Sequence, residues 1–352
     1  MITNQVLEFF AGKRVVVTGA TGSVGKALVA ALLQTGIKRL IGFDHNETGV
    51  FFLNQTHRDD DRFEGMIGDV RDLGRLKEVF TNVDVVFHGA ALKHVGICEE
   101  SPFDAVQTNI HGVQNLIKAA ASCGISHVLF MSSDKAVNPT NVMGTTKLMG
   151  ERLMTAADTL HEGENGPLFF STRFGNVLGS RGSVVEVFQK QIARGQPITL
   201  TDERMTRFVM SPAQAVSLVL ESVLLARGGE VFVTKMPVVG IPVLAQAMVN
   251  ELAPRHERKP EDIEVTTVGA RAGEKLFEEL LNEEEVRRTV ELENHFVVLP
   301  ALQPARRERL DYPGLVSSEI DNAYRSDQEQ ALTLDQTVDF LRVHELLAPR
   351  EY

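Results

Sequence analysis

The chain has 352 residues, 43% of them hydrophobic and 24% charged, which is enough apolar material for one large α/β unit or two closely joined domains. The formal net charge of -11 argues against a nucleic-acid-binding protein, because contacts to a phosphate backbone require a basic surface. Cys98 and Cys123 lack the spacing of metal ligands, so we predict no metal site and no disulfide framework. No run of about 18 apolar residues is present, and we therefore expect a cytoplasmic protein without membrane insertion.

The N-terminal half alternates between short β-branched runs and segments with helical apolar spacing. Val6, Leu7, Phe9 and Phe10 come first and predict a short amphipathic helix that packs against the body of the fold. The expected strands are 14–18, 39–43, 63–67, 83–87, 127–131 and 168–173, and the expected helices are 26–33, 73–80, 105–121 and 145–159. This alternation predicts an α/β fold with a doubly wound parallel sheet of the Rossmann type.

Beyond residue 173 the pattern becomes irregular, with many glycines and prolines. We expect residues 1–175 to form a dinucleotide-binding domain that includes the short N-terminal helix. Residues 176–300 should form most of a smaller substrate-binding domain, partly interleaved with the first. Residues 301–352 should be a C-terminal tail and a helix from about Ser326 to Leu347.

A glycine-rich turn follows the first expected strand and opens a helix. Gly19, Gly22 and Gly25 are spaced as Gly-x-x-Gly-x-x-Gly, which allows a tight turn and a close approach of the backbone to a pyrophosphate at the helix N-terminus. Asp44 ends the second strand, where a carboxylate can bind ribose hydroxyls and repel a 2′-phosphate, so we prefer NAD to NADP. The alternative is a turn that only connects strand to helix. The candidates in this region are Gly19, Thr21, Gly22, Ser23, Val24, Gly25, Asp44 and His45.

Further cofactor candidates follow the third and fourth strands. Asp69 could hydrogen-bond adenine or cap the next helix. Small residues after the fourth strand permit close approach to a flat cofactor, and Lys93 beyond them either points into the crevice or is a solvated side chain. Asn109 either bridges to the active-site strand or faces water. The full set is Asp69, Val70, Ala90, Ala91, Lys93 and Asn109.

The stretch after the fifth strand carries the strongest chemical signal. Ser133, Asp134 and Lys135 are followed eight residues later by Met143-Gly144-Thr145-Thr146-Lys147. Adjacent acidic and basic residues at the end of a strand can act as general acid and base on one substrate. The alternative, in which Ser133 and Asp134 cap a helix and Lys135 is a surface charge, leaves the other motifs unexplained.

This stretch resembles the UDP-N-acetylglucosamine 4,6-dehydratases of the extended short-chain dehydrogenase/reductase superfamily, in the branch that has methionine instead of the tyrosine of a Tyr-x-x-x-Lys pair. Matching motifs lie in order at residues 90–95, 132–147, 173–184, 201–208 and 273–279. Many members of this branch carry an N-terminal membrane region, and the chain looks like a soluble catalytic version. Because a thioether cannot carry a proton, Met143 implies that another group must deprotonate the substrate alcohol.

The resemblance implies a reaction and roles for individual residues. A 4,6-dehydratase transfers a hydride from sugar C4 to NAD, eliminates water across C5 and C6, and returns the hydride to C6. The implied base is Lys135 and the implied acid is Asp134, while Lys147 is expected to bind the nicotinamide ribose. The proton from O4 could pass to Asp134 through Ser132 or Ser133, or to an ordered water. The catalytic set is therefore Ser133, Asp134, Lys135, Met143 and Lys147.

The diphosphate of a nucleotide sugar needs fixed donors in an acidic protein, and arginine offers a forked one. Arg207 could instead pair with Asp202 or Glu203, and Glu274 could orient Arg271 rather than touch the ligand. The substrate-binding candidates are Lys93, His94, Asn176, Arg181, Ser183, Arg207, Arg271 and Glu274.

The expected partners are a UDP-sugar and a second copy of the chain. Met143 favours retention of configuration at C5 and speaks against an epimerase. The alternatives are a C5-inverting dehydratase, a GDP-sugar dehydratase, an epimerase and a catalytically inactive NAD-binding sensor. Retention of both Asp134 and Lys135 argues against the inactive sensor. We also expect a homo-oligomer, because helices beginning near Phe103 and Thr145 commonly pair between subunits in this superfamily.

Overall fold

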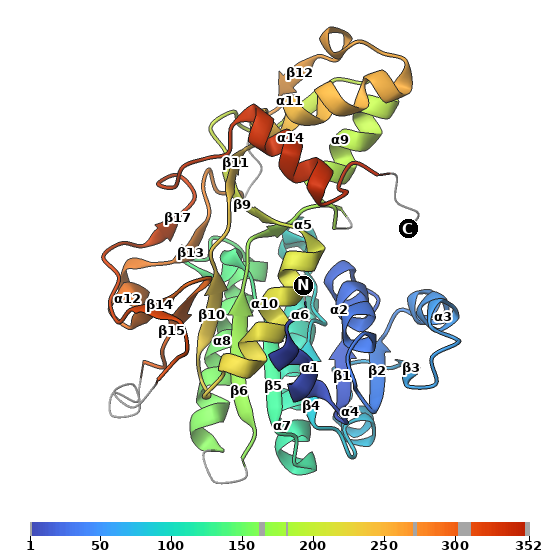
Figure 1. Ribbon diagram of the computed structural model, residues 1–352, viewed down its shortest axis with the longest axis vertical. Coiled ribbons are helices and arrows are strands. Elements are labelled where there is room, and N and C mark those ends of the chain that lie inside the picture. Colours follow the sequence, from blue (N-terminus) through green and yellow to red (C-terminus); the bar gives the residue numbers. More distant parts are fainter. Residues whose placement is uncertain (1, 162–165, 181, 270–272, 302–310, 349–352) are drawn as a thin grey trace. The chain divides into compact units, whose positions relative to one another are not determined.

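The computed structural model describes residues 2–161, 166–180, 182–269, 273–301 and 311–348 (Figure 1). The chain divides into two compact units and passes between them several times. The sheet unit comprises Met1–Phe174, Ala215–Lys235 and Leu281–Ala323. The small unit comprises Gly175–Gln214, Met236–Leu280 and Tyr324–Tyr352. The separate cofactor and substrate roles expected for two domains stay predictions.

The sheet unit is built on a ten-stranded sheet, counted over the described residues. Seven strands are parallel, in the order β10, β6, β5, β4, β1, β2, β3, and their register brings the carboxyl ends of β1, β4 and β5 together. Three antiparallel strands, β15, β14 and β16, extend the sheet beyond β10. The strands are β1 (Arg14–Thr18), β2 (Arg39–Asp44), β3 (Phe63–Ile67), β4 (Val85–His88), β5 (His127–Met131), β6 (Leu168–Arg173), β10 (Val231–Thr234), β14 (Thr289–Leu292), β15 (His295–Val298) and β16 (Leu315–Ser317). The predicted doubly wound sheet is confirmed, but the antiparallel edge was not predicted.

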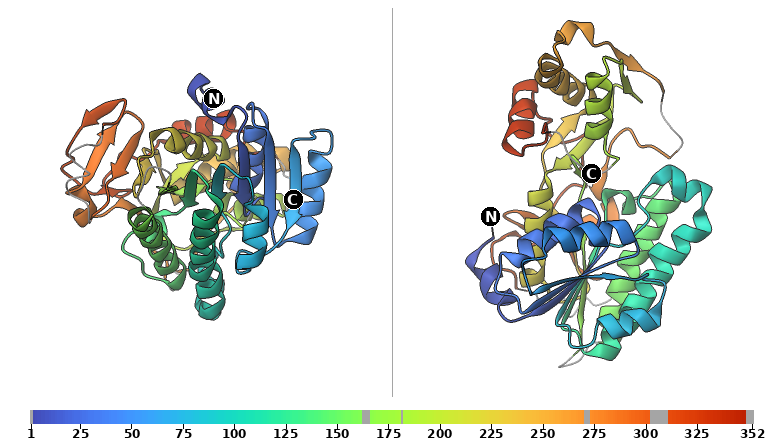
Figure 2. Two further views of the ribbon diagram at one scale, coloured as in Figure 1. Left: turned by 90° about the horizontal axis from the view of Figure 1, so that it is seen from below. Right: turned by 90° about the vertical axis from the view of Figure 1, so that its right-hand side faces the viewer.

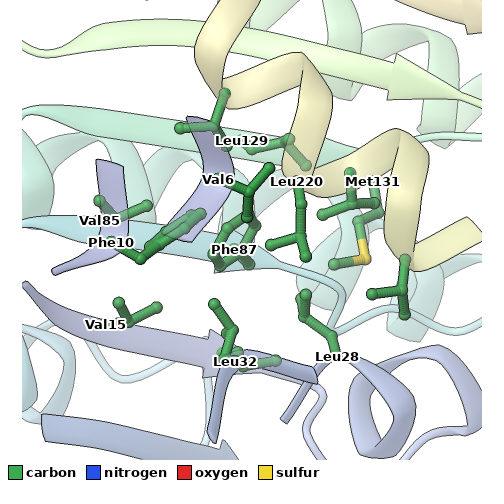
Figure 3. Close-up of a cluster of buried hydrophobic side chains, with 14 of the residues drawn as sticks. Val6, Phe10, Val15, Leu28, Leu32, Val85, Phe87, Leu129, Met131 and Leu220 are labelled. Atoms are coloured by element: carbon green, nitrogen blue, oxygen red, sulfur yellow. The ribbon is translucent and has the colours of Figure 1, made fainter. Parts of the chain in front are cut away.

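Helices cover both faces of this sheet, which Figure 2 (right) shows nearly edge-on. The face with α1 (Asn4–Phe10), α2 (Ser23–Leu33) and α10 (Pro212–Leu225) has one buried cluster, in which Val6, Phe10 and Leu220 pack near the strand residues Phe87 and Leu129 (Figure 3). The N-terminal helix therefore packs against the body of the fold, as predicted. The opposite face buries apolar residues of α4 (Leu73–Val79), α7 (Gly112–Cys123) and α8 (Val142–Leu160). The other helical elements of this unit include α3 (Glu47–Thr56), α5 (Val95–Glu100), η2 (Asp134–Ala136) and α12 (Glu283–Val286).

Two predicted helices differ from the observed ones. The helix expected over 105–121 is three segments: α6 (Pro102–Val106), a π-helical turn η1 (Gln107–His111) and α7. The terminal helix α14 spans only Leu334–Val343, because Thr333 caps it with its hydroxyl on the amide of Gln336. Its predicted start at Ser326 is wrong, and the strand β17 (Tyr324–Arg325) lies just before that residue.

The small unit has its own apolar core between short strands and three helices. Its helices α9 (Val184–Ala193), α11 (Ile241–Leu252) and α14 contribute most of the buried side chains. The charged segment 256–262 runs from the end of one short 3-10 turn, η3 (Pro254–His256), through a second, η4 (Pro260–Asp262), and neither turn has a buried residue. The remaining strands are β7 (Asn176–Val177), β8 (Ile198–Leu200), β9 (Thr206–Met210), β11 (Val238–Gly240), β12 (Val265–Thr267) and β13 (Glu279–Leu281).

Candidate active site

The glycine-rich turn lies between β1 and α2 and packs against the end of β4. Gly19 has φ +70°, and a Cβ there would lie 2.6 Å from the backbone nitrogen of Ala90, so only glycine fits. The N-cap of α2 is Gly22, and no side chain caps this helix. The uncapped helix N-terminus beside a glycine turn suits an anion such as a pyrophosphate.

Asp44 is buried at the end of β2 and reaches back to this turn. One carboxylate oxygen accepts hydrogen bonds from the Thr21 amide at 3.0 Å and the Thr21 hydroxyl at 2.8 Å. The other oxygen accepts from the Asn46 amide at 3.0 Å, while the side chain of His45 is largely exposed. The carboxylate thus fixes the turn from the neighbouring strand, and its role toward a ribose stays a prediction.

Asp69, after β3, forms a tight local turn with Arg71. Its carboxylate accepts from the Arg71 amide at 2.8 Å and from the guanidinium at 2.6 Å, and these hydrogen bonds lower the pKa of Asp69. Val70 beside it is buried. An adenine contact stays a prediction for both residues.

Asn109 is buried in the π-helical turn and does not face water, so that alternative is wrong. Its oxygen accepts from the Leu92 amide at 2.8 Å, and its nitrogen donates to the Leu92 carbonyl at 3.0 Å and to the Thr146 hydroxyl at 2.9 Å. Asn109 thus links the loop after β4 to α8 rather than to the active-site strand. Lys93 and His94 in this loop are exposed.

The Asp134–Lys135 pair lies in the η2 turn directly after β5. The ammonium of Lys135 is 2.9 and 3.1 Å from the two carboxylate oxygens of Asp134. The Ser133 hydroxyl donates to Asp134 at 2.7 Å, and the Asp134 amide donates to the Phe174 carbonyl at 3.1 Å. Asp134 is 3% exposed, whereas Lys135 is 32% exposed. The turn therefore holds a buried carboxylate and a more accessible amine in direct contact.

Helix α8 begins against this turn. Asn141 caps the helix through the Gly144 amide, and the Val142 amide donates to the Glu99 carboxylate at 2.6 Å. A Cβ on Gly144 would lie 2.2 Å from the Lys135 carbonyl oxygen, so glycine permits the contact between η2 and α8. The sequence therefore brings the two halves of the predicted catalytic motif together through a residue that cannot be enlarged.

Met143 and Lys147 lie one turn apart on α8, and both are buried. Met143 packs in an apolar cluster with Cys98 and Ala105. The Lys147 ammonium donates to the Met131 carbonyl at 2.9 Å and lies 4.8 Å from the centroid of the Phe130 ring. Burial lowers the pKa of Lys147 to about 8. The side chain where the superfamily has a tyrosine is thus enclosed by apolar groups and carries no exchangeable proton.

Two further polar groups near this site are buried: Ser132 was predicted as a possible carrier of the O4 proton, whereas His88 was given no role from the sequence. His88, the last residue of β4, has Nδ1 2.7 Å from the Thr18 hydroxyl, and burial lowers its pKa to about 3. Its Nε2 and the Ser132 hydroxyl have no hydrogen-bond partner within the described part of the chain. The position of His88 in the sequence could have identified it, because it ends a strand and directly precedes the small residues Gly89 to Ala91.

The small unit brings together three residues of the predicted substrate motifs. The Asn176 amide donates to both Glu278 oxygens at 2.8 and 2.7 Å, and the Arg207 Nε lies 3.4 Å from Glu278. Arg207 also donates to the Lys275 carbonyl at 2.9 Å. The alternative pairing of Arg207 with Asp202 or Glu203 is wrong, since Arg207 pairs with Glu278 and Asp202 pairs with Arg204. Glu278 lies in the motif at residues 273–279, but its role was not predicted.

The remaining predicted substrate-binding residues are Arg181, Ser183, Arg271 and Glu274. Ser183 is the N-cap of α9, and its buried hydroxyl has no partner among the described residues. Glu274 is exposed. Arg181 and Arg271 lie outside the described residues. A cavity of about 210 Å³ in the sheet unit contains none of the predicted site residues; its lining includes Glu151, Arg152, Thr155, Glu285, Arg288 and Pro300.

Residues 15–300 match the model of a family described as polysaccharide biosynthesis protein. The chain is 38% identical to the UDP-N-acetylglucosamine 4,6-dehydratase (inverting) of Campylobacter jejuni subsp. jejuni serotype O:23/36, over 85% of the chain and 86% of that protein. It is 49% identical to a Methanocaldococcus jannaschii protein named uncharacterized membrane protein MJ1061, over 84% and 88%. No helix within the described residues is long and apolar enough to cross a membrane.

Solved structures agree with this relationship. The X-ray structure of Pen from Bacillus thuringiensis is 38% identical, covers 97% of the chain and all of Pen, and has a TM-score of 0.89. The dTDP-glucose 4,6-dehydratase DesIV from Streptomyces venezuelae, solved with NAD and TYD bound, is only 20% identical over 75% of the chain and 86% of DesIV; its TM-score of 0.65 shows the shared fold. The chain therefore belongs to the polysaccharide biosynthesis protein family, with the UDP-N-acetylglucosamine 4,6-dehydratases as relatives and the extended short-chain dehydrogenase/reductase fold.

Proposed function

We propose that the protein is an NAD-dependent 4,6-dehydratase that converts UDP-N-acetylglucosamine to UDP-2-acetamido-4-keto-2,6-dideoxyhexose with retention at C5. The observation that carries the proposal is the Asp134–Lys135 contact of 2.9 Å at the end of β5, packed against the helix that bears Met143 and Lys147. The names of the Campylobacter relatives support the same substrate. The catalytic set, the compartment and the oligomeric state remain predictions.

The sheet unit offers a set of residues that fits NAD. The Gly19 turn and the uncapped N-terminus of α2 would hold the pyrophosphate, Asp44 would accept from the adenosine ribose, and Lys147 would donate to the nicotinamide ribose. When bound, NAD supplies an acceptor for the C4 hydride and a donor for its return to C6. A buried carboxylate at position 44 would repel the 2′-phosphate of NADP, which favours NAD.

Asp134 and Lys135 can carry all the protons of the elimination. Asp134 takes the O4 proton, for which the Ser133 hydroxyl at 2.7 Å offers a route, and later gives that proton to the leaving C6 hydroxyl as water departs. Neutral Lys135 takes the C5 proton and returns it to C5 after the hydride reaches C6. The protons balance over one cycle: the sugar loses one water, and Asp134 and Lys135 return to the protonation states in which they started.

The ion pair in the structure has a defined place in this cycle. A charged Asp134–Lys135 pair holds as many protons as a protonated Asp134 beside a neutral Lys135, so one proton transfer across 2.9 Å interconverts them. In water this transfer is uphill by about 9 kcal/mol, from the difference of ~6.5 units between the reference pKa values. Asp134 is 3% exposed, so little water reaches its carboxylate to stabilise the charged form.

Retention at C5 follows from a single proton carrier. Lys135 lies on one side of the sugar, so the proton it removes returns to the same face. Inversion would need a second donor on the opposite face, and the Met143 thioether cannot provide one. The Campylobacter relatives are named as inverting enzymes, which supports inversion at C5 instead. Inversion at C5 is therefore the second candidate.

The test is proton NMR of the purified protein with UDP-N-acetylglucosamine in deuterated water, without added cofactor. We expect a new 6-deoxy methyl signal, deuterium at C5 and ring couplings of the retained configuration. Couplings of the inverted sugar would establish the second candidate. An unchanged spectrum from protein that contains NAD would refute the dehydration of this substrate and direct the search to GDP-linked sugars and then to the inactive sensor.

A further inference from the structure

A buried ion network in the sheet unit lies one helical turn beyond Lys147. Glu151 follows Lys147 by four residues on α8, so the two side chains share a face of the helix. The Glu151 carboxylate accepts from Arg173 Nε at 3.0 Å and Nη2 at 2.6 Å. Arg173 also donates to Glu285 at 2.8 and 2.9 Å. Arg173 is 1% exposed, and each carboxylate is 3% exposed.

Stability alone does not account for this arrangement. Burying an ion pair or triad costs desolvation energy, and well-packed apolar residues often give equal or greater stability. The triad carries a net charge of -1, since two carboxylates share one guanidinium. Lys147 lies at one end and Arg288, 3.8 Å from Glu285, at the other. The charges thus alternate from the active-site lysine to Arg288.

Lys147 needs such a neighbour because it has no ion pair within the described residues. Its ammonium contacts a carbonyl oxygen and the face of Phe130, both of which are weaker partners than a carboxylate. Burial favours its neutral form, and Glu151 is the carboxylate that opposes this effect. A neutral amine at this position would be a weaker donor to the ribose hydroxyls and could not lower the pKa of Lys135.

We propose that Glu151, held by Arg173 and Glu285, is a positioning residue that keeps the buried Lys147 charged at neutral pH and fixes its place on α8. What the charged Lys147 then does in catalysis rests on the proposed function. Its charge state does not, and it can be measured in the absence of substrate.

The test is NMR of protein labelled with ¹³C at the lysine Cε, titrated from pH 6 to pH 10, with the Lys147 signal assigned by its loss in Lys147→Arg. In the wild type we expect Lys147 to be charged at pH 7, with a titration midpoint near the pKa of about 8. In Glu151→Gln the midpoint should fall by about one unit, a tenfold smaller ratio of charged to neutral form, as expected for a charge removed at one turn's distance.

Two variants separate this effect from a structural one. Glu285→Gln removes a carboxylate from the same guanidinium but one step farther from Lys147, and it should shift the midpoint much less. Glu151→Asp keeps the charge and should restore most of the wild-type midpoint. If Glu151→Gln does not fold, the wild-type titration remains decisive, because a Lys147 that is neutral at pH 7 would overturn the proposal. Equal midpoints in wild type and a folded Glu151→Gln would also overturn it, whether or not the protein is a dehydratase.

Discussion

In the proposed mechanism, Met143 leaves the proton transfers of this site to two adjacent residues, Asp134 and Lys135. Met143 is 3% exposed and surrounded by apolar side chains, so neither a water nor its own sulfur can deliver a proton from that position. Asp134 and Lys135 lie in contact in a turn that Gly144 holds against α8. Lys135 must therefore be able to lose its proton.

Lys135→Arg tests this requirement while keeping a positive charge beside Asp134. Because a guanidinium is not deprotonated in proteins, the variant should lose about 10²- to 10⁴-fold in kcat, the usual contribution of a general base. For the wild type, kcat/KM should rise with pH until the Lys135 amine is neutral. Product formation followed by NMR across pH 6 to 9 measures the kcat of the variant and the pH dependence of kcat/KM in the wild type. A Lys135→Arg variant with normal kcat would exclude the role of Lys135 as the base.

Asp44 should govern cofactor affinity and selectivity. Asp44→Asn removes the charge that would bind the ribose and weakens the acceptor for two Thr21 hydrogen bonds, so NAD affinity should fall by roughly 10- to 100-fold, in the range for hydrogen bonds to charged groups. The preference for NAD over NADP should narrow. Calorimetric titration with NAD and with NADP measures the two affinities. The control is Thr21→Val, which removes only the hydroxyl contact and should lose less NAD affinity than Asp44→Asn.

At the scale of elements, the contact between η2 and α8 sets the geometry of the site. Gly144→Ala would place a methyl group 2.2 Å from the Lys135 carbonyl oxygen and must push the turn away from the helix. We expect kcat to fall at least tenfold, since a displacement of about 1 Å can cost a hundredfold, while the fold survives. Gly96→Ala on α5 meets no atom within 4 Å and should leave kcat unchanged. Circular dichroism and the NMR assay together distinguish a displaced site from an unfolded one.

The sequence predicted helices and strands correctly where a local residue pattern determines where they begin and end. β1, β3, β5 and β6 begin and end at the predicted residues. Three of them, β1, β5 and β6, are short, mostly buried runs bounded by turn residues, whereas the edge strand β3 has no buried residue. The terminal helix was predicted to start eight residues too early and to end four residues too late, since Thr333 is a stronger helix start than any signal near Ser326. The pairing of β10 with β6 and of β15 with β10 depends on contacts far apart in the chain, which no local pattern reveals.

In the candidate site, too, local motifs could be predicted from the sequence, whereas contacts between distant residues could not. The adjacent pair Asp134–Lys135 and the turn at Gly19 were evident from spacing. Arg173 and Glu285, by contrast, are 112 positions apart, and their contact appears only in the folded chain. Asn176, Arg207 and Glu278 likewise converge from separate motifs.

At the scale of the whole molecule, buried histidines should make stability depend on pH. Burial lowers the pKa of His127 and of His295 to about 4 and that of His88 to about 3, all below the unfolded value of 6.5. Below pH 6.5 the unfolded chain therefore binds protons that the folded chain does not, and the free energy of unfolding decreases as pH falls toward 4. Denaturant unfolding at pH 7, 6 and 5 measures the slope. His127→Gln should reduce it, and an unchanged slope in that variant would show that His127 is not the source.

The most direct test of the account is the Lys135→Ala variant incubated with UDP-N-acetylglucosamine in deuterated water and followed by NMR, with Met143→Ala measured in parallel. We predict that Lys135→Ala forms neither the 6-deoxy methyl group nor deuterium at C5, although it retains bound NAD, and that Met143→Ala keeps appreciable activity. A methyl signal that grows at the wild-type rate in Lys135→Ala would contradict the central claim that this amine removes and returns the C5 proton.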